Sequence, residues 1–155
     1  MVLSHVDEMH LRMVRGNRAA YDFLTTMFEV LHFWDDLIDN DREVTPEEVN
    51  RSMWSALVTI PENSFFQQNF SQLMPLLKVA IFNWQAANVM ERSQDTLDKQ
   101  IAFVLRSTYV DLVSMCAYIV GGRDWAHEVA LEARRQTSSE GFDDYLDALT
   151  REKRI

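Results

Sequence analysis

The scarcity of chain breakers is the feature that most constrains how this sequence can fold. Only four Gly and three Pro occur among its 155 residues, whereas a β-rich chain needs many such residues for its tight turns. Long helices are therefore favoured, and no alternating strand pattern stands out. A chain of this length can bury roughly two-thirds of its unfolded surface in one core. We therefore predict one helical domain over residues 1–155.

Start and stop signals divide the chain into about seven helical segments. Ser4, Asn17 and Thr45 are suitable capping residues, and Thr45-Pro46-Glu47-Glu48 has the pattern of a capping box. Proline predicts that one helix ends before Pro61 and that another is kinked or broken at Pro75. The expected segments are 4–15, 18–39, 45–60, 63–92, 95–120, 125–135 and 142–149, the fifth ending at Gly121-Gly122.

The segment 95–120 is apolar on nearly every side. A helix of this kind is usually surrounded by other helices, which makes a bundle the natural architecture. We therefore predict an all-α fold, a compact bundle of six to seven helices with this segment near its centre. Its apolar residues are Ile101, Phe103, Val104, Leu105, Val110, Leu112, Val113, Met115 and Ile119.

Charge and cysteine content narrow the class of protein. The formal net charge of −9 repels nucleic-acid phosphates, so nucleic acid is not an expected partner. The single Cys116 can form no internal disulfide, and the first residues do not resemble a signal peptide. No run approaches eighteen uncharged apolar residues, so no membrane span is expected. We therefore expect a cytoplasmic protein.

Three carboxylates are concentrated at the end of the second segment. Asp35, Asp36 and Asp39 lie on one helical face together with His32. Acids one turn apart can share a hard divalent cation such as Mg²⁺. Their position at a helix C-terminus costs some stability, which favours a functional explanation. A solvated helix end and a partner-docking surface are the two alternatives.

The run Phe33-Trp34-Asp35-Asp36-Leu37-Ile38-Asp39 resembles the first aspartate-rich motif, DDxxD, of class I isoprenoid and terpenoid synthases. The resemblance implies a reduced version of that family's helical bundle. It also implies that Asp35, Asp36 and Asp39 hold Mg²⁺, which binds and activates an allylic diphosphate. We therefore expect Mg²⁺-dependent binding or turnover of a diphosphate ester, with His32 near the substrate.

The resemblance also directs attention to a second group of residues. In that family a second metal motif has oxygen-bearing residues at intervals of four, and Asn83, Ala87 and Glu91 have this spacing here. Asn83 and Glu91 are thus candidate metal ligands, although Asn83 also fits a hydrogen-bonded amide of the core. Arg106 is embedded among the apolar residues of the fifth segment, and a buried Arg needs a charged partner. It is a candidate phosphate ligand opposite the aspartates of the second segment, or it forms a structural ion pair with one of them.

The sequence also fits other functions. The main alternative is a non-catalytic helical interaction protein that forms a homodimer through an apolar face. A second alternative is an all-α nucleotide pyrophosphohydrolase, which also binds Mg²⁺ on acidic helices. Glu29 and His32 have the ExxH spacing of di-iron helical proteins. A di-iron site needs a second such pair, which would be Asp124 and His127, at the very start of a short helix.

Overall fold

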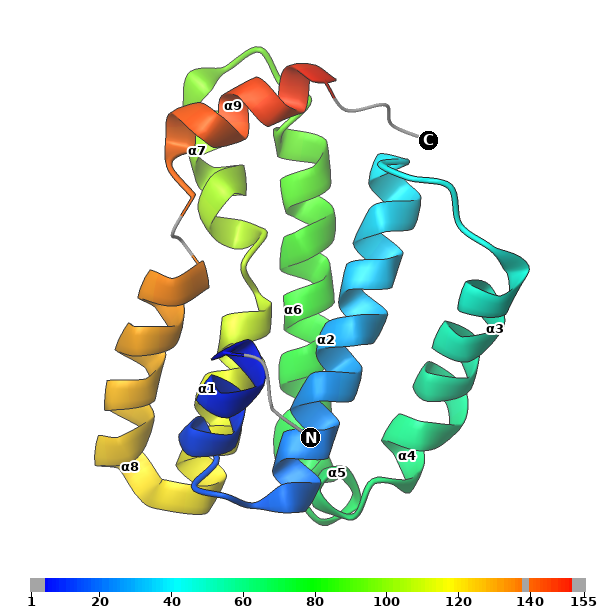
Figure 1. Cartoon of the computed structure of the whole chain (residues 1–155). Helices are drawn as coiled ribbons and strands as arrows, with labels where there is room; N and C mark the ends of the chain where they lie inside the picture. Colours follow the sequence, from blue (N-terminus) through cyan, green and yellow to red (C-terminus); the bar gives the residue numbers. More distant parts are fainter. Residues whose placement is uncertain (1–4, 138–139, 152–155) are drawn as a thin grey trace. The chain divides into compact units, whose positions relative to one another are not determined.

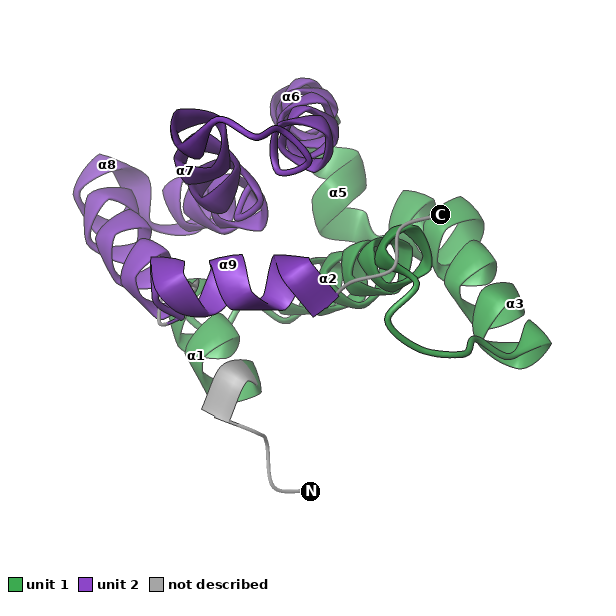
Figure 2. Cartoon of the chain, turned by 90° about the horizontal axis from the view of Figure 1, so that it is seen from above, with its two compact units in different colours: residues 1–70, 152–155 green, residues 71–151 purple. Residues whose placement is uncertain are grey.

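A computed structural model describes residues 5–137 and 140–151 (Figure 1). Helices connected by short loops make up this part of the chain, and it contains no strand. The predicted all-α helical bundle is thereby confirmed, while Ser4, the expected first cap, lies outside the described residues. The chain divides into two compact units (Figure 2). The N-terminal unit comprises residues 1–70 with 152–155, and the C-terminal unit comprises residues 71–151.

The N-terminal unit begins with α1 (His5–Met13) and α2 (Arg18–Asp39). Between them the chain turns through Arg15 and Gly16, whose φ angles of 52° and 74° are positive. The Asn17 side chain accepts a hydrogen bond from Ala20 N at 3.0 Å, and this satisfies an N–H that has no partner within the helix. Both ends of α2 therefore agree with the predicted segment.

The third segment opens with the predicted capping box. Thr45 Oγ1 accepts from Glu48 N at 3.2 Å, and Thr45 N donates to the Glu48 carboxylate at 2.9 Å. The predicted stop before Pro61 is wrong. Three consecutive elements, α3 (Pro46–Trp54), the π-helical turn η1 (Ser55–Thr59) and α4 (Ile60–Glu62), carry the helix through the proline.

The π-helical turn explains why Pro61 does not end the helix. Ile60 N donates to Ser55 O, five residues earlier. In an α-helix the proline ring would clash with the carbonyl four residues before it, here that of Leu57. The wider turn just before Pro61 gives the ring room, because it shifts the hydrogen-bond register by one residue.

Phenylalanine side chains join α5 (Ser64–Gln68) to α2 in the core of this unit. The Phe23 ring stacks on Phe66 with centroids 5.4 Å apart and lies 6.3 Å from Phe65. Asn63 caps α5 by accepting from Phe66 N, and its amide donates to Ala19 O near the start of α2, both at 2.9 Å. One side chain thus starts α5 and attaches it to α2.

The next helix, α6 (Phe70–Met90), runs through Pro75 without interruption. The predicted break of the fourth segment lies at Asn69 instead. There the backbone leaves helical geometry, with φ −119° and ψ 22°, and the Asn69 amide donates to Phe65 O at 2.9 Å. A side chain that satisfies a carbonyl at the end of α5 competes with continuation of the helix.

The fifth segment is divided into α7 (Thr96–Leu105) and the first part of α8 (Tyr109–Thr137) by a turn at residues 106–108. Gly122 then redirects α8, with φ 83° and ψ −175°, so the predicted stop near Gly121-Gly122 is a change of direction. The prediction of a surrounded helix holds for the start of α8, where Val110, Leu112, Val113, Cys116 and Ala117 are buried. It is wrong for α7, because Leu97, Ile101 and Val104 are exposed.

One stretch of the described chain, residues 96–136, is long and apolar enough to cross a membrane by length and composition alone. Its backbone is interrupted twice, by the turn at 106–108 and by Gly122. A membrane-spanning helix needs about 20 consecutive apolar residues. Neither regular piece before Gly122 reaches that length.

Candidate functional site

The last two turns of α2 hold the predicted acidic residues. Asp35 and Asp36 are half-buried, and Asp39 is buried, with 6% of its surface exposed. His32 lies one turn earlier and is exposed, with its ring centroid 4.3 Å from that of Phe28. The acids are therefore not a freely solvated helix end, and His32 packs against an aromatic ring.

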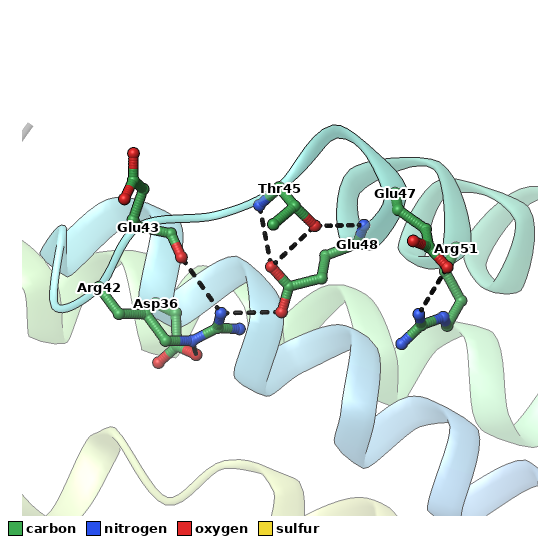
Figure 3. Close-up of polar contacts among 7 residues, drawn as sticks. All are labelled: Asp36, Arg42, Glu43, Thr45, Glu47, Glu48 and Arg51. Carbon is green, nitrogen blue, oxygen red and sulfur yellow. Dashed lines mark hydrogen bonds and ion pairs between the residues drawn. The ribbon is translucent and has the colours of Figure 1, made fainter.

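Arg42 connects the end of α2 to the start of α3 (Figure 3). Its guanidinium forms ion pairs with Asp36 at 3.0 Å and with Glu48 at 2.8 Å. Glu48 uses its other carboxylate oxygen for the capping box at Thr45. Asp36 thus already has a cationic partner, which the helical face of the α2 acids did not indicate.

The charges at this end of the unit also shift each other's proton affinity. The Thr45 N–H and then the Arg42 guanidinium lower the pKa of Glu48. Burial raises the pKa of Asp41, and the negative charges of Asp35 and Asp36 raise it further. The positive charge of Arg42 therefore offsets the negative charges of Asp36 and Glu48. Asp35 and Asp41 add further negative charge next to Asp36.

A metal centre needs several ligand atoms that converge on one point. Within residues 5–137 and 140–151, no group of three or more His, Cys, Asp or Glu side chains could hold a metal ion. Asp35 and Asp39 each interact with another group of the protein, and Asp36 is bound by Arg42. The Mg²⁺ site therefore stays a prediction.

The other candidate residues belong to the C-terminal unit. Glu91 is buried and accepts a hydrogen bond from the Tyr145 hydroxyl at 2.5 Å. Arg106 pairs with Glu140 at 2.5 Å, and its guanidinium carbon lies 4.5 Å from the centroid of the Tyr145 ring. Asn83 is half-buried on α6.

These contacts attach α9 (Phe142–Arg151) to the helices before it. Phe103 of α7 packs against both Phe142 and Tyr145, with centroids 5.6 Å and 5.1 Å away. Arg106 has the charged partner that the sequence led us to expect, but the partner is Glu140. Glu140 and Tyr145 were missed because they lie 34 and 39 positions further along the chain, where spacing on a single helix gives no signal.

A surface that the sequence analysis also missed lies on α6 and α7. These two helices lie side by side in both views (Figure 1 and Figure 2). Each helix exposes large apolar side chains at intervals that place them on one of its own sides, and we call the two rows together the α6–α7 face. Its members are Val79, Phe82, Val89, Leu97, Ile101 and Val104.

The spacing within α6 could have revealed this surface. Val79, Phe82, Ala86 and Val89 follow intervals of three and four residues, which place them on one side of a helix. Leu73, Ala80 and Ala87 are buried on the opposite side. Periodicity shows that a helix has two apolar sides but does not show which of them is covered.

No protein-family model matches the chain, and no curated protein or solved structure matches it either. A functional assignment therefore rests on the chemistry of the two units themselves.

Proposed function

We propose that this chain is a helical interaction protein that self-associates through the α6–α7 face. The observation that carries the proposal is the exposure of six large apolar side chains on two neighbouring helices, including Phe82 at 64% and Val89 at 68%. Scattered apolar residues are normal on a protein surface, but a contiguous apolar patch is typical of an interaction site.

The arrangement of these side chains suits helix-on-helix packing. On α6 the exposed apolar residues recur every three to four positions, and Leu97, Ile101 and Val104 repeat this spacing on α7. Ridges of this kind pack into the grooves of another helix pair. Two copies of the face, related by a two-fold axis, would bury these ridges in a four-helix arrangement.

The distribution of charge favours a second copy as the occupant. Two chains of net charge −9 repel each other, so association costs least where the surface carries little charge. Lys78 is the only charged residue of α6, and α7 contains Asp98 and Lys99, which offset each other. The face thus combines apolar side chains with almost no net charge.

Sedimentation equilibrium of the full chain tests this proposal. Wild type should have a mass twice the 18.1 kDa of one chain, and Phe82→Glu/Val104→Glu should be a monomer. Charged groups placed at the centre of an apolar contact would lose their hydration without gaining partners. The matched control is Met53→Glu/Leu57→Glu, which changes two exposed apolar residues of the N-terminal unit and should leave the dimer intact. A monomeric wild type, or a dimeric Phe82→Glu/Val104→Glu variant, would contradict the proposal.

Mg²⁺-dependent diphosphate binding is a second candidate function. The observation in its favour is the concentration of negative charge at the end of α2, where the charges of Asp35 and Asp36 add to the effect of burial in raising the pKa of Asp41. Calorimetry with Mg²⁺ and pyrophosphate tests it directly, alongside Asp35→Asn/Asp39→Asn. Binding that this variant loses would support the function. Absence of binding by folded wild type would leave self-association as the proposed function.

A further inference from the structure

The helical run formed by α3 and η1 has its amphipathic pattern reversed. No residue from Pro46 to Thr59 is buried. Of the half-buried positions, Glu48, Ser52, Ser55 and Ala56 are small or polar, and Val58 is the one larger apolar residue among them. The large apolar side chains point to solvent instead, with Trp54 exposed by 64% and Leu57 by 67%.

We call the four exposed large apolar residues of this run the α3–η1 ridge: Val49, Met53, Trp54 and Leu57. Trp54, three residues before Leu57, lies beside the row that the other three form. Val49, Met53 and Leu57 follow at intervals of four. A π turn holds more residues than an α turn, so Leu57, inside η1, stays in line with Met53. π-helical turns are frequent at functional sites, and here the turn extends an apolar ridge on the solvent side.

Contacts within the unit hold this run in place without use of the ridge. The capping box fixes its first turn, and Arg42 ties Glu48 to Asp36 of α2 (Figure 3). Met53, Trp54 and Leu57 are therefore free to take part in binding without disturbing the elements that position them. Met side chains in particular adapt to different apolar partners.

The charge of the two halves of the chain indicates the chemistry of the partner. Residues 1–70 contain twelve Asp and Glu against five Arg and no Lys, a net charge of −7. Residues 71–155 contain twelve acidic and ten basic residues, a net charge of −2. The ridge thus lies on the strongly acidic half, where a second copy of the same ridge would be repelled and a basic partner attracted.

We propose that the α3–η1 ridge docks an amphipathic helical segment of a partner protein, with apolar side chains on one face and Lys or Arg along its edges. An apolar helix face laid against an apolar ridge is a recurring mode of peptide recognition. Exposed acids flank the run along the chain, Glu43 before it and Glu62 after it, and they would meet the basic edges. The exposed Glu47 already pairs with Arg51 at 3.5 Å. This inference uses other helices than the self-association proposed above and is independent of it.

The test uses a synthetic amphipathic helix of Leu and Lys, about 18 residues long so that it forms several turns, and a matched peptide with Glu in place of every Lys. Fluorescence anisotropy of each labelled peptide is followed as the full chain is added. Wild type should bind the Lys peptide and not the Glu peptide. Met53→Ser/Leu57→Ser should weaken binding of the Lys peptide by roughly tenfold or more, as the loss of central interface side chains does.

Two controls separate the ridge from the rest of the surface. Val79→Ser/Phe82→Ser removes apolar side chains of comparable exposure from α6 and should leave peptide binding unchanged. Binding should also shift the fluorescence of wild type to shorter wavelength, and Trp54→Phe should lose that shift because Trp54 lies on the ridge. Since these side chains are exposed, the variants should retain the circular dichroism of wild type.

Three results would overturn the inference. Binding of the Lys peptide by Met53→Ser/Leu57→Ser as tightly as by wild type would show that the peptide contacts another acidic surface. If wild type bound the Glu peptide as tightly as the Lys peptide, the charge of the partner would play no part in binding. A smaller sedimentation mass for Met53→Ser/Leu57→Ser than for wild type would show that the ridge is covered by a second copy. The first two results leave the self-association proposal untouched, whereas the third would also contradict its Met53→Glu/Leu57→Glu control.

Discussion

At the scale of single residues, His10 makes the stability of the protein depend on pH. Its ring is buried, 3% exposed, in the N-terminal unit and lies edge-on to Phe28 with centroids 6.0 Å apart. Burial lowers the pKa of His10 from its ordinary 6.5, and the charge of Asp7 offsets only part of that effect. The unfolded chain therefore binds the His10 proton at a higher pH than the folded chain does.

The sign of the effect follows from this difference. Above pH 6.5, His10 is mainly neutral in both states and costs nothing. As the pH falls through and below that value, the unfolded state gains a proton first, so the free energy of unfolding decreases. Urea unfolding at about pH 7.5 and pH 5.5, on either side of the ordinary histidine range, should show this loss. The loss should be smaller in His10→Phe and unchanged in His32→Gln, whose histidine is exposed.

Tyr145 offers a second prediction at this scale. Its hydroxyl donates to Glu91, and both side chains are buried, at 2% and 7% exposure. Tyr145→Phe keeps the aromatic packing on Phe103 and Arg106 but removes this donor from a buried carboxylate. We expect a loss of about 1–3 kcal/mol in the free energy of unfolding, measured with urea. Tyr118→Phe, at an exposed position on α8, should change it little, and equal losses in both variants would contradict the assignment.

At the scale of helices, a comparison of Asn17 with Asn63 distinguishes the energy of a helix cap from that of a hydrogen bond between two helices. Asn17 only caps α2, whereas Asn63 caps α5 and also donates to Ala19 O, 44 residues away. Loss of a cap costs about 1 kcal/mol, and loss of the additional hydrogen bond costs about 1 kcal/mol more. Asn63→Ala should therefore reduce the free energy of unfolding by roughly twice as much as Asn17→Ala. Equal losses would mean that the bond to Ala19 contributes nothing.

The helices also show which of their starts and ends the sequence can predict. Asn17 and Thr45 mark helix starts because a cap acts on backbone groups two or three residues away. Pro61 was misleading because the outcome depended on the π turn before it, and a proline pattern does not contain that information. Asn69 broke a helix where Pro75 did not, since its side chain takes a carbonyl of α5. Local signals were reliable for a cap that acts on its own first turn, and they failed where the hydrogen-bond register of the preceding turn decided the outcome.

The candidate site at the end of α2 also has features that the sequence predicts and features that it does not. The shared face of Asp35, Asp36 and Asp39 follows from helix geometry alone. Helix geometry does not predict the partner of Asp36, because Arg42 lies in the loop after α2. Nor does it predict the second partner of Arg42, Glu48, which belongs to the next helix. The exposed apolar side chains on α6 and in the α3–η1 run were hidden for a related reason. Periodicity identifies an apolar side of a helix, whereas burial depends on the other helices around it.

At the scale of the whole molecule, the uneven charge of the chain predicts opposite responses to salt. Self-association joins two copies of net charge −9 through a nearly neutral face, so long-range repulsion opposes it. Peptide docking joins a basic helix to the half of the chain that carries −7, so long-range attraction assists it. Salt weakens both effects, because the screening length falls from about 10 Å at 0.1 M to about 3 Å at 1 M.

Raising NaCl from about 0.05 M to about 0.5 M, a range over which most surface electrostatics is screened, should therefore tighten the dimer and loosen the peptide complex. Sedimentation equilibrium gives the first constant and fluorescence anisotropy the second, in the same buffers. The Phe82→Glu/Val104→Glu variant should remain monomeric at every salt concentration, which confines the first response to the α6–α7 face. A dimer that loosens with added salt would mean that ion pairs hold the two copies together. The apolar side chains of α6 and α7 would then not be the main source of affinity.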